Sequence, residues 1–318
     1  MLRQMSAADL QEVNLLLSKA FTHGYLEDGL RNRRVPLCKL SFLEYYQLAE
    51  PEGAYVIEET GRLVAYCFSR CWGSVGWLGP LSVLPEETGK GYGKEIVTTG
   101  IEYLKRSGVQ TIGLEMAAVS GRNLAFYTKL GFQVDAPTVD CVRPVAATTR
   151  TGENNDFEVV RLSRIAAAER PALLSAIRQF SARFQPALDY SDEITRCLYF
   201  GFGDAILLLD NGQIIALMIA HTETYSAEEK RQFLKVNILQ ISPGLPIQII
   251  DSCIDILERW AREEDLRALY VRVPTRYTGA FRYLLQNSFQ IAQNDLRLTL
   301  KGFELLDKSD MINFSKWE

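Results

Sequence analysis

The sequence predicts an α+β protein with a mixed central sheet flanked by helices, and it predicts this fold twice along 318 residues. Three observations lead to this prediction. Apolar hairpin strands stand beside a strand–helix–strand unit, an order typical of α+β folds. The same element order returns in the second half. A shift of 157 residues aligns the halves without a gap, and it places GFQV at 131–134 on SFQI at 288–291.

The first half begins with an amphipathic helix, in which Leu10, Val13 and Leu17 recur at helical spacing after the N-cap candidate Ser6. Thr60-Gly61 is a turn signal between two strands. A strand should also follow Gly131-Phe132. We expect helices at 7–20, 40–49, 90–107 and 121–130, and strands at 54–59, 63–72, 75–83, 110–117 and 157–162, the last of which closes the first domain.

The second half repeats this order. Asn211-Gly212 is a strong hairpin signal, and Ile250, Ile254 and Leu257 form one helical stripe. We therefore expect two domains, 1–165 and 166–318. The expected helices are 167–183, 192–199 and 247–262; the expected strands are 204–209, 213–222, 233–241 and 266–274, followed by a helix and a strand at 288–291.

The composition is that of an ordinary globular protein, with 47% hydrophobic residues and a net charge of −4. The lack of basic excess argues against nucleic acid as a partner. The longest apolar run, 214–220, is too short to cross a membrane, and the first residues lack a secretory pattern. Six scattered cysteines and only two histidines predict no metal site. We expect a cytoplasmic protein of undetermined oligomeric state.

The most informative stretch is LSVLPEETGKGYGKEI at 81–96, where a strand leads through three alternating glycines into a helix. Glycine lets a ligand approach the backbone closely. The N–H groups of the first helical turn then face that ligand, and the helix dipole favours an anion. Lys90 and Lys94 add positive charge. The pattern predicts a diphosphate site; the alternative is a turn that only joins strand and helix.

Two common phosphate motifs do not fit this stretch. A nucleotide P-loop requires Ser or Thr after Gly-Lys, but Gly91 follows Gly89-Lys90. The dinucleotide motif G-x-G-x-x-G would need glycine where Lys94 or Ile96 stands.

The stretch instead resembles the acetyl-CoA loop of the GNAT superfamily, (Gln/Arg)-x-x-Gly-x-(Gly/Ala), between a strand and a helix. Gly91 and Gly93 match the two small positions, whereas Thr88 replaces Gln or Arg. The resemblance implies a GNAT fold, acetyl-CoA as co-substrate and a main-chain cradle for its diphosphate. It implies cofactor contacts from Leu81, Ser82, Val83, Thr88, Gly89, Lys90, Gly91, Tyr92, Gly93 and Lys94.

A second motif, LEMAAVSGRNLAFYTKLGF at 114–132, resembles the later GNAT motif that ends in Tyr-x-x-x-Gly-Phe. The resemblance implies that Tyr127 is the general acid, which protonates the departing CoA thiolate. Ser120 and Asn123 stand where the family often has Asn and Ala, and they are expected at the pantetheine arm. The alternative for Tyr127 is a helical tyrosine that packs beside Phe126.

The base is left open between a side chain and water. An attacking amine must lose a proton, since alkyl amines are mostly protonated at pH 7. Glu115 faces away from the apolar row of its strand, and it lies twelve residues before Tyr127. This spacing resembles the catalytic glutamate of the ribosomal-protein N-terminal acetyltransferase branch. A salt-bridged strand glutamate is the alternative. His23, expected in the loop after the first helix, is a weaker candidate.

The second half lacks these parts at the aligned positions. Two prolines, Pro243 and Pro246, interrupt the stretch near its expected cofactor loop, and proline has no N–H to donate. The shift of 157 places Glu115 on Arg272 and Tyr127 on Leu284. The chain thus resembles tandem GNAT proteins with one competent and one degenerate half.

The sequence therefore predicts transfer of an acyl group, most simply acetyl, from acyl-CoA to a small-molecule or peptide amine. A non-catalytic acyl-CoA sensor or interaction module is the alternative, and a longer acyl group or an oxygen acceptor stays open. The acceptor site is expected at 21–40 and 134–156, with a contribution of the second domain left open.

Overall fold

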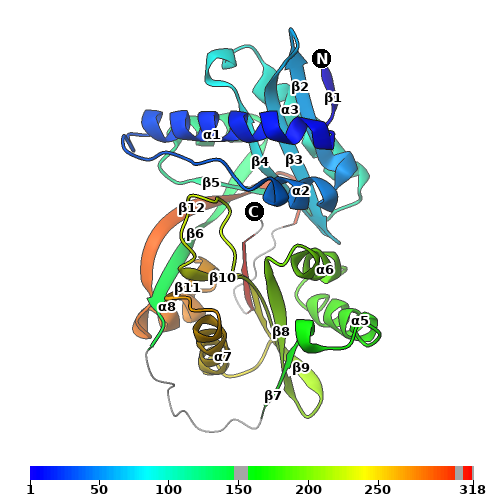
Figure 1. Ribbon diagram of the computed structural model, residues 1–318, viewed down its shortest axis with the longest axis vertical. Helices are drawn as coiled ribbons and strands as arrows, with labels where there is room; N and C mark the ends of the chain where they lie inside the picture. The colour runs from blue at the N-terminus through cyan, green and yellow to red at the C-terminus, as the bar shows by residue number, and fades with distance from the viewer. Residues whose placement is uncertain (147–156, 305–310, 317–318) are drawn as a thin grey trace.

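The computed structural model describes residues 1–146, 157–304 and 311–316. In Figure 1 the first half lies above the second, and strands β6 and β12 run from one to the other. Part of the expected acceptor segment, 147–156, lies outside the described residues. The first half contains β1 Leu2–Gln4, α1 Leu10–Glu27, α2 Leu40–Ala49, β2 Ala54–Glu59, β3 Arg62–Trp72, β4 Val75–Val83, α3 Tyr92–Arg106, β5 Thr111–Ala117, α4 Gly121–Lys129 and β6 Phe132–Pro144.

The second half follows the same order of elements and adds one strand at its end. It contains β7 Glu158–Arg161, α5 Arg170–Ser181, α6 Ser191–Tyr199, β8 Gly203–Asp210, β9 Gln213–His221, β10 Phe233–Ile241, α7 Ile249–Glu263, β11 Ala268–Pro274, α8 Thr278–Gln286, β12 Gln290–Leu300 and β13 Ile312–Ser315. The predicted α+β fold in two copies is confirmed.

All described strands join one mixed sheet, in the order β1-β2-β3-β4-β5-β12-β6-β11-β10-β9-β8-β7, with β13 beside β10. The last strands of the two halves are exchanged. β12 from the second half pairs with β5 of the first, and β6 from the first half pairs with β11 of the second. The exchanged strands also pair with each other. Each half therefore completes its sheet with a strand from the other.

An approximate two-fold axis relates the two halves and runs between the exchanged strands β6 and β12. Thr138 on β6 pairs with Asp295 on β12, and these residues occupy equivalent positions under the shift of 157. The shift also places α3, β5 and α4 on α7, β11 and α8 with identical bounds. The predicted repeat is thus correct for these elements.

The gap-free alignment is wrong before β10. β8 starts 149 residues after β2 (203 against 54), whereas β10 starts 158 residues after β4 (233 against 75). The difference lies in one connection. Only Gly73-Ser74 joins β3 to β4, but residues 222–232 join β9 to β10. The second half therefore carries an insertion, which we call segment 222–232.

The boundary predicted at residue 165 also needs correction. The strand expected at 157–162 to close the first domain is β7, and it pairs antiparallel with β8. It extends the sheet of the second half, because its apolar residues find their neighbours there. Leu162, directly after β7, is fully buried in a cluster with residues of α5, β8 and β9.

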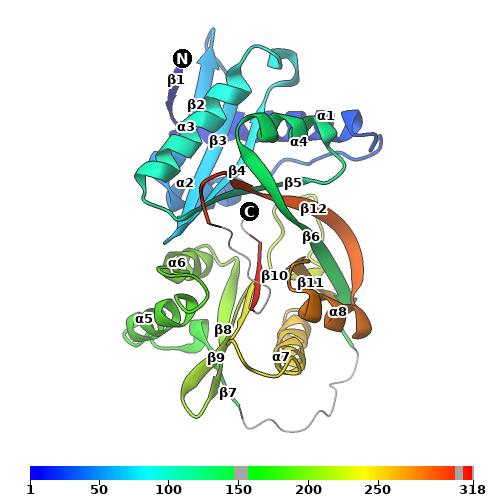
Figure 2. The same cartoon turned by 180° about the vertical axis from the view of Figure 1, so that it is seen from behind.

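Helices cover both faces of the sheet. In the first half α1 and α2 lie on one face (Figure 1) and α3 and α4 on the other (Figure 2). Ile96, Val97 and Leu104 of α3 are fully buried. The cores of the halves are shared, since Trp72 and Trp77 pack in a cluster with Phe180 and Leu207. Among the described residues, no helix combines the length and hydropathy needed to span a membrane.

Candidate active site

The two parallel strands at the centre of the first half pair over a short stretch only. β4 and β5 pair from Val75–Trp77 to Thr111–Gly113. Beyond Trp77, β4 keeps β3 on its other side up to Val83, but in the described part of the chain no strand pairs with it on the β5 side. Leu81, Ser82 and Val83 are half-buried along this opening. Their strand therefore offers main-chain groups to an extended ligand.

The glycine turn lies at the end of this opening. Gly89 and Gly91 have φ of +85° and +97°, and a Cβ at either would meet nothing within 4 Å. Gly91 caps α3, whose first N–H groups have no intrahelical acceptor. At Gly93 a Cβ would lie 3.5 Å from Phe126 Cζ and 3.6 Å from Val83 Cγ2. The turn, the end of β4 and α4 thus meet at one place.

Two side chains that were expected to contact the cofactor instead interact with residues of the turn itself. Thr88 Oγ1 donates a hydrogen bond to the Pro85 carbonyl. Lys90 Nζ lies 2.7 Å from Glu87, which raises the pKa of Lys90. Tyr92 is half-buried, whereas Lys94 is exposed at the start of α3. The groups of the turn that an anion would meet are therefore main-chain N–H groups, with Lys94 as the nearby cation.

Tyr127 points from α4 into the core of the first half. Its residue exposure is 9%, and its ring lies 5.1 Å from Phe126 and 5.9 Å from Phe132 between centroids. Burial, with a smaller effect of the Cys67 thiol, raises the pKa of Tyr127 well above its usual value. The phenol therefore stays protonated at neutral and mildly alkaline pH, as an acid requires.

The start of α4 carries polar groups that suit a ligand. Ser120 is fully buried, and its Oγ has no hydrogen-bond partner within the described chain. A buried hydroxyl without a partner is uncommon and costly. Asn123 lies half-buried one turn further on. Together with the unpaired edge of β4, Ser120 fits the amide-rich arm of a CoA molecule.

The expectation that Glu115 acts as base does not fit the structure. Its side chain is 1% exposed. One carboxylate oxygen accepts from Arg272 Nη1 at 2.6 Å, and the other accepts from Arg297 Nη2 at 2.8 Å. Because two guanidinium groups occupy both oxygens, neither is available to an incoming amine. The strand alternation correctly placed Glu115 away from the apolar row, but the exchanged strand β12 covers that face.

Glu115 belongs to an ionic cluster that lies at the approximate two-fold axis between the halves. Arg272 also donates to Asp140 and contacts Asp295, each at 2.7 Å. The pair Glu115–Arg297 and the pair Arg272–Asp140 are equivalent under the shift of 157, with the charges reversed. Sequence analysis did not identify Asp140 and Arg297, although their opposite charges at equivalent positions were a usable signal.

His23 lies within α1, not in a loop as expected, because the helix continues to Glu27. Its Nδ1 is 3.7 Å from Glu27, and its side chain is 43% exposed. Glu27 also forms an ion pair with Arg122 at the start of α4. The end of α1 therefore lies beside the helix that carries Tyr127.

The equivalent opening in the second half is filled by the chain itself. β13 pairs with β10 from Ile238 to Ile241, the positions that correspond to Leu81–Leu84. Phe314 of β13 is 1% exposed in the second core, and the Ser315 carbonyl accepts from Arg297 at 2.8 Å. The second opening is therefore closed where the first stays open.

An open pair of parallel strands, a glycine turn before a helix and a buried tyrosine on the next helix are features of a GNAT-type fold. In agreement, residues 11–132 match the Acetyltransferase (GNAT) family. The chain has the GNAT fold in two copies, and its family match lies in the first half.

Known proteins resemble the chain over different lengths. A mycothiol acetyltransferase of Acidimicrobium ferrooxidans is 31% identical over 98 residues, which span 29% of this chain and 32% of that protein. A putative acetyltransferase of Pyrococcus horikoshii shares the fold with a TM-score of 0.68 and 14% identity, over 99% of this chain and 94% of that one. A tandem GNAT protein of the clavulanic acid pathway matches with a TM-score of 0.63 and 10% identity, over 98% and 99%. At these identities the solved structures establish the fold alone.

Proposed function

We propose that this protein is an acyl-CoA-dependent N-acyltransferase, that it uses acetyl-CoA, and that the first half alone binds the cofactor. The observation that carries this proposal is the opening between β4 and β5, with the Gly89–Lys94 turn at its end and buried Tyr127 on the adjacent helix α4. The name of the curated relative, mycothiol acetyltransferase, supports acetyl as the group transferred.

The residues that would hold acetyl-CoA form a continuous track. The main-chain N–H groups at the start of α3 would hold the diphosphate, with Lys94 nearby. Leu81–Val83 would pair with the pantetheine amides, and Ser120 Oγ would gain a partner. Thr88 and Lys90 would shape the turn through Pro85 and Glu87.

Bound acetyl-CoA supplies an acyl group activated as a thioester. The acceptor amine attacks the acyl carbon, and Tyr127 donates its phenolic proton to the departing thiolate. Water takes the proton of the amine, because both oxygens of Glu115 are held by arginines. The protein thus contributes orientation and one positioned acid.

The test combines calorimetry with release of CoA thiol in the presence of a panel of amines. We expect binding of acetyl-CoA and turnover of at least one amine. Tyr127→Phe should bind acetyl-CoA normally but lower kcat by about 10²-fold or more. Tyr199→Phe is the matched control, because Tyr199 is 81% exposed. Binding without turnover would identify a sensor, and the absence of binding would refute the cofactor site.

A further inference from the structure

A cavity lies between the halves, lined by Arg33 of the first half and mainly by residues of the second. Its volume is about 600 Å³, within the range of pockets for small molecules. We propose that this cavity is the acceptor pocket, an inference that rests on the proposed function. The acceptor is then an amine that also carries an anionic group, either a carboxylate or a phosphate.

Two elements connect the cavity to the open strands. The first is β12. Its residue Gln293 lines the cavity, and Asp295, two residues further on, pairs with Ala117 at the end of β5. At about 3.3 Å per residue, the cavity edge lies about 7 Å along β12 from that strand end. The connection 28–39 between α1 and α2 starts beside α4, through Glu27 and Arg122. It supplies Arg33 to the lining, where Arg33 Nη2 donates to Gln293 Oε1 at 3.3 Å.

The insertion of the second half forms the opposite wall. Segment 222–232 rises from β9 and β10 toward the first half (Figure 1). The Tyr225 carbonyl accepts a hydrogen bond from the Lys39 amide at 2.8 Å. Ser226 and Cys38 form an isolated antiparallel β-bridge. The insertion absent from the first half therefore lies against the α1–α2 connection of the first half.

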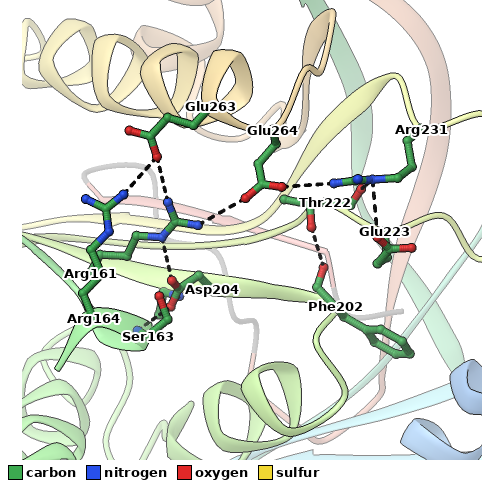
Figure 3. Close-up of polar contacts among 11 residues, drawn as sticks. Arg161, Ser163, Arg164, Phe202, Asp204, Thr222, Glu223, Arg231, Glu263 and Glu264 are labelled. Carbon is green, nitrogen blue, oxygen red and sulfur yellow. Dashed lines mark hydrogen bonds and ion pairs between the residues drawn. The ribbon is translucent and has the colours of Figure 1, made fainter. Parts of the chain in front are cut away.

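Segment 222–232 is held from behind by an ionic network (Figure 3). Arg231 lies 3.2 Å from Glu264 at the end of α7, and 3.3 Å from Glu223. Glu264 in turn lies 3.6 Å from Arg161 of β7. Arg231 also donates to the Thr222 carbonyl at 3.1 Å. The wall is thus fixed to the frame of the second half, which is what a specificity element needs.

The charged lining is predominantly cationic. Among the described residues it contains four cations, Arg33, Lys230, Lys235 and Lys316, and two carboxylates, Glu223 and Glu229. Glu223 is compensated from outside the lining, by Lys39 at 2.9 Å and by Arg231. A concave surface with an excess of one charge concentrates ligands of the opposite charge. An anionic acceptor fits this cavity better than a cationic one.

Aromatic rings hold two of these cations in place. Lys235 Nζ lies 3.8 Å from the Tyr225 ring centroid, and Lys316 Nζ lies 5.6 Å from that of Tyr270. Lys316 follows β13 directly, so the strand that closes the second opening also brings a cation to the cavity. The features that remove a cofactor site from the second half thereby build the pocket for the first.

The experiment compares matched amines at saturating acetyl-CoA: glycine with glycinamide, and phosphoethanolamine with ethanolamine. The two pairs separate carboxylate from phosphate. We expect the anionic member of at least one pair to have a kcat/KM at least tenfold higher. The double variant Arg33→Gln, Lys230→Gln should raise the KM for the preferred anionic amine at least tenfold and leave the KM for acetyl-CoA unchanged. Arg31→Gln is the control, because Arg31 is exposed on the same connection and does not line the cavity.

The outcomes separate this inference from the proposed function. Equal or better use of the neutral members, or an anionic preference that survives in the double variant, would overturn the inference. The inference would also be overturned if the protein binds acetyl-CoA but neither anionic amine gives a heat of binding in calorimetry or any turnover. That result would leave the proposed cofactor site intact. Failure to bind acetyl-CoA would overturn the proposed function itself.

Discussion

The roles proposed for individual residues of the site depend on where the backbone places them. Gly91 was recognisable because alternating glycines before a helix are unfavourable without a purpose, and its φ of +97° confirms a left-handed position. Tyr127 was recognisable from its spacing to Gly131-Phe132, and its burial agrees with an acid role. The two arginine partners of Glu115 could not be predicted, because they lie 157 and 182 residues away and no local pattern contains them.

Gly91→Ala should weaken acetyl-CoA binding at least tenfold. The new Cβ would enter the open space of the diphosphate cradle, and the backbone would be strained at that φ. Gly212→Ala is the matched control, since Gly212 has φ of +76° and open space in a hairpin of the second half. Calorimetry on both variants gives the comparison; equal affinity in the two would argue against the cradle.

Glu115→Gln should destabilise the protein without removing its chemistry. The change removes a buried carboxylate that accepts hydrogen bonds from both Arg272 and Arg297, and breaking a buried ion pair costs about 3 kcal/mol or more. Urea unfolding should show this loss, whereas Glu102→Gln, in an exposed pair with Lys105, should change stability little. If the folded Glu115→Gln variant instead loses about 10²-fold in kcat, Glu115 is a base after all.

At the scale of elements, the sequence located nearly every helix and strand but not their partners. Periodicity is local, so α2, β2, β4 and β10 were predicted with the observed bounds. The edge strand β1 and the terminal strand β13 are too short to give a periodic signal. β13 matters most among these, because it decides that the second half has no open pair of strands.

The chain should bind one acetyl-CoA, because β13 fills the second opening and Pro243 and Pro246 interrupt the equivalent turn. Calorimetry should give a stoichiometry near one. A variant that ends at residue 310 lacks β13, and it should keep that stoichiometry with lower stability. Two equivalents in either form would show that the second half retains a cofactor site.

At the scale of the molecule, the sequence predicted two copies of a fold but described them as separate domains. The strands β6 and β12 have the same alternating pattern whether they pair within or between halves, so the exchange could not be read from them. The shared clusters have the same origin, since Cys197 and Phe202 of the second half pack in the first core.

Residues 1–146 alone should fail to fold, because β5 would lose β12 and β6 would lose both of its neighbours. Mixing this fragment with residues 157–318 should restore secondary structure and acetyl-CoA binding. Circular dichroism and calorimetry on each fragment and on the mixture would measure this. A fragment 1–146 that binds acetyl-CoA alone would show that the exchange is dispensable.

The exchange of β6 and β12 also sets a schedule for synthesis on the ribosome. The strand β12, which pairs with β5, ends at Leu300, so the sheet of the first half cannot be completed before residue 300 has been translated. A prematurely terminated product would contain every residue of the glycine turn and Tyr127 yet hold them in an unfinished sheet. Completion of the first half is thereby tied to translation of the second.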